Sequence, residues 1–226
     1  MHLRRMNYTH KLLPNKYYHV YNRAVGSEIC FRDRRNFLFF LRRVQEYLYP
    51  VMDVIAYCLI PNHFHLLVRI KEEKILREFY EKKKGLTLAP EMTVNWHKVA
   101  MTQLKNMLSS FAKAVNKDRQ RKGALFCDYT KRIEVVDHEY LENLIHYIHY
   151  NPVNHGFVND PMDWEWSSFF RLLNADKKTY ARVLMQRHFG SMDRFFHKHQ
   201  VFSKGISLSL DEVAPNFEEQ NELSFT

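Results

Sequence analysis

The stretch YCLIPNHFHLLV, residues 57–68, decides the fold because it holds the turn of a β-hairpin. The β-rich runs 51–60 and 63–70 meet there and are separated only by the dipeptide Pro61-Asn62. Two strand-like runs joined by so short a turn pair with each other in an antiparallel sheet. The sequence therefore predicts a hairpin in the first half of the chain.

Two histidines stand at the start of the second strand of this hairpin. Successive side chains of a strand point to opposite faces, so His63 and His65 share one face while Phe64 points to the other. Two imidazoles on one face can reach the same divalent ion, but a stable site needs at least one further ligand from another element. The alternative is that both histidines only pack or cap in a half-buried sheet.

The apolar pattern on either side of the hairpin predicts a sheet with helices packed against it. The predicted strands are 17–25 and 124–136, and the predicted helices are 33–49, 94–118 and 137–151. Asp33 and Asp137 suit helix N-caps, and Pro152 is expected to end the last of these helices. The order βαββαβα indicates an α+β fold with a ferredoxin-like, split βαβ antiparallel sheet and flanking helices.

Beyond residue 160 the pattern changes, and residues 161–226 are expected to form an aromatic-rich, mainly helical C-terminal extension. Helices are predicted in 179–189 and 193–202, after the aromatic packing segment 163–170. The last twenty residues, 207–226, are expected to form a loosely held acidic tail.

Composition excludes several classes of protein. A chain of 226 residues with 46% hydrophobic content can build a folded core, so disorder throughout is not expected. No apolar run approaches the roughly 18 residues of a membrane span, and the N-terminus lacks the apolar segment of a signal peptide. Three widely spaced cysteines without a CxxC pair predict neither a disulfide framework nor a zinc finger. We expect a cytoplasmic protein with no membrane partner.

The charge is basic and unevenly distributed. The chain carries a formal net charge of +9, and residues 1–50 hold ten Lys and Arg against three Asp and Glu. A basic surface favours a polyanion partner, because each phosphate neutralised by Lys or Arg releases counterions. Charge alone does not distinguish a nucleic-acid interface from an ordinary basic surface.

The predicted helix 137–151 offers the missing ligand for the histidine pair. Tyr147 and Asn151 are four residues apart and share one helical face. The amide oxygen of Asn151 could be a third ligand, and Tyr147 would then lie beside the ion. Tyr150 faces away from Asn151, and Tyr140 lies roughly 10 Å along the helix axis.

This combination of groups suits phosphoryl transfer. A divalent ion bound to a phosphodiester oxygen withdraws charge, and a phenol beside it becomes more acidic than its usual pKa of about 10. Tyr147 could then attack phosphorus and keep the energy of the broken linkage in a covalent phosphotyrosine. The alternative is that Tyr147 is a helix-packing residue and that Asn151 only serves the helix end before a proline.

Five stretches, taken in order, resemble one family of proteins. They are YYHVYNRAVGSEICF, YCLIPNHFHLLV, GALFCDYTKR, YLENLIHYIHYNPVNHGFV and DWEWSSF, and they lie within residues 17–170. Together they resemble the single-tyrosine HUH transposases, in particular the REP-associated tyrosine transposases. The segment EKKKGLTLAPE, residues 81–91, departs from the family pattern.

The resemblance implies a role for each candidate residue and an activity for the protein. His63 and His65 would be the HUH pair, Asn151 the third metal ligand and Tyr147 the nucleophile, within an HUH nuclease domain of residues 1–160. The implied cofactor is Mg²⁺ or Mn²⁺. The implied substrate is single-stranded DNA near a hairpin of a bacterial genome, which is cut through a 5′-phosphotyrosine intermediate by a monomer or a homodimer.

DNA contacts are expected from residues near this site. Arg23, Lys131 and Arg132 are candidates for the DNA backbone, and Tyr129 is a candidate for stacking on an unpaired base. Two other functions stay open. One is a binding module that holds hairpin DNA or RNA without catalysis, and the other is an unrelated metal-dependent hydrolase in which Tyr147 is a spectator.

Overall fold

The computed structural model describes residues 9–174 and 180–203, and its centre is a four-stranded sheet. The strands are β1 (Tyr17–Arg23), β2 (Met52–Ile60), β3 (His63–Ile70) and β4 (Lys131–Val135), in the spatial order β2-β3-β1-β4. All three neighbouring pairs are antiparallel. Strand β3 therefore lies between β1 and β2, which run parallel to each other, and the predicted split βαβ arrangement is confirmed.

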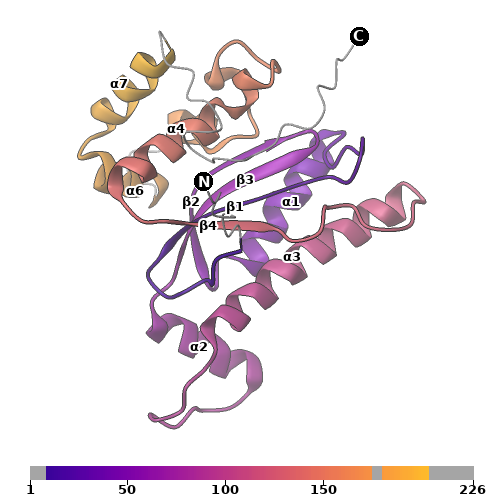
Figure 1. The fold of residues 1–226 in the computed structure, drawn as a ribbon, viewed down its shortest axis with the longest axis vertical. Coiled ribbons are helices and arrows are strands. Elements are labelled where there is room, and N and C mark those ends of the chain that lie inside the picture. Colours follow the sequence, from indigo (N-terminus) through magenta and orange to yellow (C-terminus); the bar gives the residue numbers. More distant parts are fainter. Residues whose placement is uncertain (1–8, 175–179, 204–226) are drawn as a thin grey trace, which may run out of the picture.

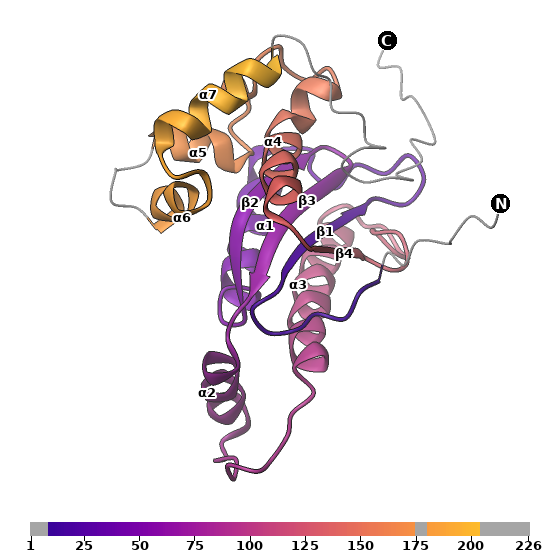
Figure 2. The same cartoon turned by 60° about the vertical axis from the view of Figure 1, so that its left-hand side comes forward.

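Helices cover both faces of the sheet (Figures 1 and 2). They are α1 (Arg34–Tyr47), α2 (Glu73–Lys84), α3 (Trp96–Asp118), α4 (His138–Asn154), the short 3₁₀ helix η1 (Pro161–Asp163), α5 (Ser168–Asn174), α6 (Tyr180–Phe189) and α7 (Met192–Ser203). Helices α1 and α3 pack on one face, whereas α4 and the C-terminal helices pack on the other. The predicted helices at 179–189 and 193–202 are confirmed as α6 and α7.

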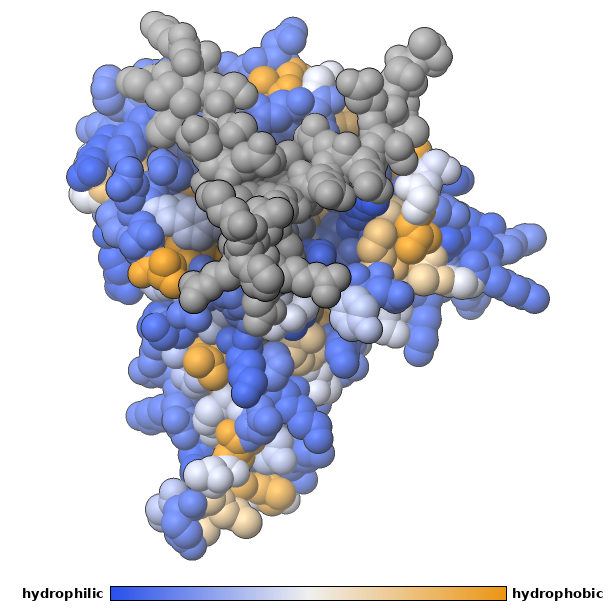
Figure 3. All heavy atoms as spheres, in the orientation of Figure 1, coloured by the Kyte–Doolittle hydropathy of each residue, from blue (hydrophilic) through white to orange (hydrophobic). Residues whose placement is uncertain are grey.

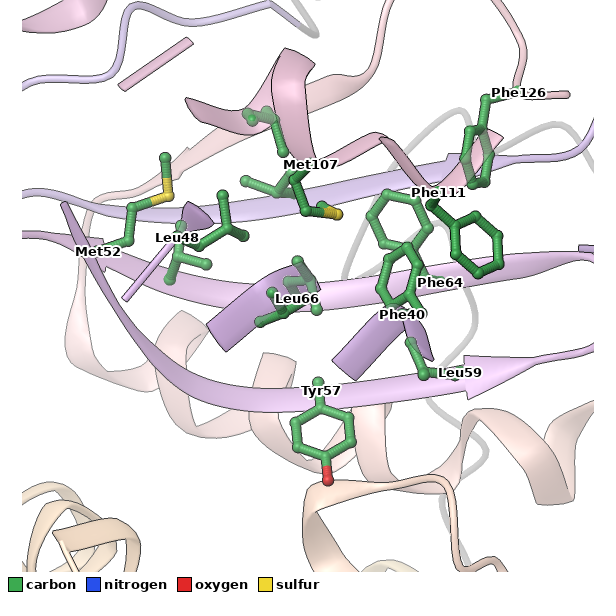
Figure 4. Close-up of a cluster of buried hydrophobic side chains, with 14 of the residues drawn as sticks. Phe40, Leu48, Met52, Tyr57, Leu59, Phe64, Leu66, Met107, Phe111 and Phe126 are labelled. Atoms are coloured by element: carbon green, nitrogen blue, oxygen red, sulfur yellow. The ribbon is translucent and has the colours of Figure 1, made fainter. Parts of the chain in front are cut away.

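The alternation of strand β3 separates the two cores. Phe64 is fully buried against α1 and α3, with its ring 5.1 Å from that of Phe40, and Figure 4 shows it beside Phe111. Leu67, on the other face, belongs to the hydrophobic cluster that α4 closes. Both faces of β3 are buried, so its register is fixed, because a shift by one residue would exchange Phe64 for histidines in the core.

Two N-caps set where α1 and α4 begin. The carboxylate of Asp33 accepts hydrogen bonds from the backbone N–H groups of Arg35 and Asn36, and that of Asp137 accepts one from Tyr140. Both predicted caps are confirmed, and such a cap stabilises a helix by about 1 kcal/mol. The cap at Asp137 thereby fixes the start of the helix that carries Tyr147.

The predicted end of the helix at Pro152 is wrong. Helix α4 continues to Asn154 with Pro152 inside it, and the chain leaves the helix through Gly156, whose φ of +70° suits glycine. Proline removes a backbone donor, but near the end of a helix this leaves later bonds intact, such as the one from His155 N to Asn151 O. Asn151 therefore lies within regular helix.

Two further segments differ from the prediction. The strand expected over 124–136 is regular only at Lys131–Val135, because Tyr129 has a φ of +61° that interrupts an extended run. Helix α2 was not predicted. It projects from the sheet in Figure 1, and its Arg77 guanidinium donates to the backbone oxygens of Leu88 and Ala89 in the following loop.

The segment after residue 160 is attached to strand β2. The backbone N–H of Leu59 donates to Trp166 O at 3.0 Å, and the backbone N–H of Tyr57 donates to Ser168 Oγ at 2.9 Å. The division into domains 1–160 and 161–226 stays a prediction, and the acidic tail predicted for 207–226 lies outside the described residues. The described residues that are visible in Figure 3 are mostly hydrophilic. No helix within 9–174 and 180–203 is long and apolar enough to cross a membrane.

Candidate active site

Strand β3 and helix α4 bring the four predicted site residues together. His63, His65, Tyr147 and Asn151 are each at most 4% exposed. Nε2 of His63 lies 3.2 Å from Oδ1 of Asn151, and the Asn151 amide donates to the Tyr147 hydroxyl at 3.4 Å. The ring of Tyr147 stands perpendicular to that of His65, with 5.4 Å between their centroids. The alternation of strand β3 and the helical spacing of α4 thus place the four side chains at one site.

Asn62 determines which nitrogen of His63 carries hydrogen. Its Oδ1 lies 2.9 Å from His63 Nδ1, and an amide oxygen can only accept, so Nδ1 donates and Nε2 presents a lone pair. That lone pair faces Oδ1 of Asn151, a second acceptor, because the Asn151 amide nitrogen points to Tyr147. If Nε2 carried the hydrogen instead, the lone pair of Nδ1 would face Oδ1 of Asn62 at the shorter distance of 2.9 Å, and the repulsion would only change place. A cation bound between His63 Nε2 and Asn151 Oδ1 would remove this repulsion.

His19, on the neighbouring strand β1, is a hydrogen-bonding partner of His65. Its Nε2 lies 2.8 Å from Nδ1 of His65, and His19 is completely buried. If Nε2 of His19 accepts, His65 donates from Nδ1 and its Nε2 is the nitrogen with the lone pair. The pairing of β1 with β3 explains this contact, since Tyr21 lies opposite His65 and His19, two residues before Tyr21, lies on the same face.

Burial keeps these imidazoles neutral. Burial, together with the neighbouring His155 and the positive charge of Arg23, lowers the pKa of His63 to about 3. Burial also lowers the pKa of His65 well below its usual value and that of His19 to about 3. A neutral imidazole has the lone pair that a metal ligand requires.

The donor set fits a small divalent cation. Within residues 9–174 and 180–203, no three His, Cys, Asp or Glu side chains gather as a metal site, so the pair of histidines needs an amide oxygen to complete one. Neighbouring ligands of an octahedral ion at about 2.1 Å lie about 3 Å apart. The 3.2 Å between His63 Nε2 and Asn151 Oδ1 is close to this separation.

The candidate DNA contacts are placed differently from one another. Arg23 lies opposite His63 and is exposed, and Lys131 lies opposite Tyr21 on the same face of the sheet. Arg132 points to the other face, is 7% exposed, and donates to the backbone oxygens of His10 and Thr130. Its guanidinium holds the N-terminal segment, and we do not propose it as a phosphate contact.

Tyr129 is a highly accessible member of the predicted contacts. Its side chain is 80% exposed in the loop before β4. An exposed aromatic ring beside a basic strand end can stack on a base. Its stacking role stays a prediction.

The comparisons with known proteins were made on sequence and on structure. No protein-family model matches the sequence. A Haemophilus influenzae protein that is provisionally named a REP-associated tyrosine transposase is 30% identical over 133 residues, which span 57% of this chain and 64% of that protein. A solved REP-associated tyrosine transposase bound to a REP hairpin superposes with a TM-score of 0.55, at 12% identity, over 78% of this chain and 96% of the other. The chain resembles the REP-associated tyrosine transposases in both sequence and fold. At 12% identity the solved transposase supports the fold alone, and the matched relative is covered over less than two thirds of its length.

Three residues of the candidate active site were missed by the sequence analysis. Asn62 was interpreted only as part of the turn, and His19 only as part of a strand. The third is His155, whose ring lies 4.9 Å from that of His63. The alternation of β1 could have found His19, because Tyr21 and His19 share the face that β3 fills with histidines. Nothing local predicts His155, since it reaches His63 only through the turn after α4.

Proposed function

We propose that this protein is a metal-dependent single-stranded DNA endonuclease and strand transferase of the REP-associated tyrosine transposase type. The observation that supports this best is the placement of the Tyr147 hydroxyl beside the facing acceptors of His63 and Asn151. The similar transposase solved with a REP hairpin supports hairpin DNA as the partner. The protein would act as a monomer or a homodimer.

Three atoms would hold the metal, namely Nε2 of His63, Nε2 of His65 and Oδ1 of Asn151. Mg²⁺ or Mn²⁺ bound there would neutralise charge on the scissile phosphate and make the nearby phenol more acidic. Asn151 has a second role, because its amide nitrogen donates a hydrogen bond to the phenol oxygen of Tyr147. The O–H hydrogen of Tyr147 therefore points away from Asn151. One side chain thus links the ligand set to the nucleophile.

The proposed reaction exchanges one phosphoester for another. The Tyr147 oxygen bonds to phosphorus and the bond from phosphorus to the 3′-oxygen breaks. The DNA on the 3′ side of the cut therefore stays on the protein through its 5′-phosphate, and the DNA on the 5′ side is released with a 3′-hydroxyl. The phenol proton passes to water or to a basic side chain nearby, and the leaving 3′-oxygen takes up a proton. The reverse attack by a 3′-hydroxyl rejoins a strand without any external energy source.

The proposal is tested with a pool of labelled hairpin oligonucleotides that have randomised single-stranded flanks. With Mn²⁺ we expect a protein–DNA adduct that survives denaturation and a matching released strand. Binding without an adduct would favour a non-catalytic hairpin-binding protein. Cleavage that leaves no DNA on the protein would favour a metal-dependent hydrolase, and either result would refute the proposal.

His19 gives a prediction about the metal site itself. Loss of an outer partner of a metal-binding histidine typically lowers metal affinity by about 10- to 100-fold. We therefore expect His19→Leu to weaken Mn²⁺ binding to this extent, and His19→Gln, whose amide oxygen can stand near the position of Nε2, to restore most of it. Calorimetric titration with Mn²⁺ measures both.

The matched control for this experiment is His97→Leu. His97 accepts a hydrogen bond from the backbone of Leu12 at 3.0 Å and lies on α3, across the sheet from the site. Its loss should leave Mn²⁺ affinity unchanged. Equal affinity in His19→Leu and in the unmodified protein would show that His19 does not orient His65.

A further inference from the structure

A pocket of about 540 Å³ opens beside the candidate active site. Three separate segments form it: residues 29–32 before α1, Pro61 in the β2–β3 turn, and residues 155–157 after α4. His155 lines the pocket, and its ring also meets that of His63 at 4.9 Å and 68°. One imidazole therefore separates this pocket from the proposed metal ligands.

The first wall of the pocket is held by bonds from neighbouring elements. The guanidinium of Arg119 donates to the backbone oxygens of Ile29 and Cys30. The backbone N–H of Phe31 donates to Pro61 O at 3.0 Å, which joins this wall to the hairpin turn. The pocket wall is thus fixed to α3 and to the start of β3.

The second wall is aromatic. Phe157 lines the pocket and its ring lies 5.5 Å from that of Trp164, whose indole N–H donates to Leu59 O at 2.8 Å. Gly156 precedes it with a φ of +70°, which lets the chain turn sharply after α4. Phe157 is therefore presented on a supported backbone and not on a free loop end.

The lining suits a planar, uncharged group beside a phosphate. It combines the half-buried rings of Phe157 and His155 with one exposed cation, Arg32, and it also includes the edge of the core residue Phe31, which is buried. Among the described residues that line the pocket none is acidic, and Arg32 forms no salt bridge within 9–174 and 180–203. Aromatic walls stack bases, and a nearby arginine binds the phosphate.

We infer that this pocket receives an unpaired nucleobase next to the phosphate that Tyr147 attacks. Phe157 stacks on the base, Arg32 contacts the adjoining backbone phosphate, and the strand passes His155 to reach His63. The inference rests on the proposed function for the identity of the strand. It adds a positioning site, because a base held there fixes which phosphate meets the nucleophile.

The first test uses the whole protein and free nucleotides, so it does not depend on cleavage. Titration with each of the four deoxynucleoside monophosphates, followed by ¹⁵N–¹H NMR, should shift the amide signals of Arg32, Gly156 and Phe157. Inorganic phosphate should shift that of Arg32 alone. Because Phe157→Leu removes the ring on which the base stacks, it should weaken nucleotide binding by roughly tenfold. Shifts that are the same for phosphate and nucleotides would overturn the inference.

A second pocket supplies the matched control. It has a volume of about 350 Å³, is lined by Tyr49, Arg42 and Arg171 among others, and also combines an aromatic ring with arginines. It contacts Leu66 of β3, which points away from the histidine face. Tyr49→Leu should leave nucleotide binding unchanged. An equal loss in Tyr49→Leu and Phe157→Leu would show general stacking and overturn the inference.

The second test joins the pocket to the reaction. An abasic nucleotide beside the cut site should lower adduct yield by roughly tenfold with the unmodified protein. With Phe157→Leu the intact oligonucleotide should already show this loss, and the abasic one should add nothing. If the abasic nucleotide and Phe157→Leu each lower adduct yield and their effects multiply when combined, the inference is overturned. If no oligonucleotide gives an adduct, the proposed function fails, while the nucleotide titration still decides on the pocket.

Discussion

Replacement of Tyr147 by phenylalanine is expected to abolish both the protein–DNA adduct and strand cleavage, with a loss of at least roughly 10³-fold. The change removes one oxygen atom from a ring that is 2% exposed. That oxygen accepts a long hydrogen bond of 3.4 Å from Asn151, and the loss of such a bond costs about 1 kcal/mol of stability. Gel analysis under denaturing conditions measures the adduct and the released strand together.

Two other tyrosines on α4 serve as controls for this variant. Tyr150 donates to the backbone oxygen of His199 at 3.0 Å, and Tyr140 is half-buried seven residues before Tyr147. Tyr140→Phe and Tyr150→Phe should keep the adduct. If Tyr147→Phe binds Mn²⁺ with unchanged affinity, its loss of activity is due to the missing nucleophile and not to a damaged metal site. Full cleavage by Tyr147→Phe would refute the assignment.

Removal of the metal is expected to stop the reaction as completely as removal of the nucleophile. Chelation with EDTA should leave no adduct, and added Mn²⁺ should restore it. Asn151→Leu removes the amide oxygen but keeps a similar side-chain volume. Loss of a residue that only supports a metal ligand lowers affinity by about 10- to 100-fold, and we expect Asn151→Leu to lower Mn²⁺ affinity at least that much. Electron paramagnetic resonance of bound Mn²⁺ follows the affinity directly.

Two further substitutions sharpen the test of Asn151. Asn151→Asp keeps an oxygen at the same position and adds charge, so Mn²⁺ should bind at least as tightly as in the unmodified protein. Asn154→Leu removes an exposed amide from the last turn of the same helix and should have no effect. Equal Mn²⁺ affinity in Asn151→Leu and Asn154→Leu would exclude Asn151 as a ligand.

The hairpin and its two histidines could be predicted because their causes are local. A two-residue turn between β-rich runs defines the pairing of β2 with β3, and alternation then places Phe64 opposite to its neighbours His63 and His65. Helix α4 was equally predictable from its cap at Asp137. Its continuation through Pro152 was not, because a proline is tolerated where few later helical bonds depend on it.

The rest of the site depends on contacts between distant segments. Alternation along β1 indicates the face on which His19 lies, but its contact with His65, 46 positions away, depends on the pairing of β1 with β3. His155 meets His63 across 92 positions, and no local pattern predicts that pair. Arg132 shows the same limit. Adjacent to Lys131 in the sequence, it points to the opposite face and bonds to a segment 122 positions earlier. Both residues are basic, so charge alone did not distinguish Lys131 from the buried Arg132.

The central claim is that Tyr147 becomes covalently linked to DNA in the presence of a divalent metal. The most direct test is to trap the adduct with Mn²⁺, digest both the protein and the DNA, and locate the attached nucleotide by tandem mass spectrometry. The account predicts a single modified residue, Tyr147, with the nucleotide joined through its 5′-phosphate. A nucleotide on Tyr140, on Tyr150 or on any other residue, or joined through a 3′-phosphate, would contradict it.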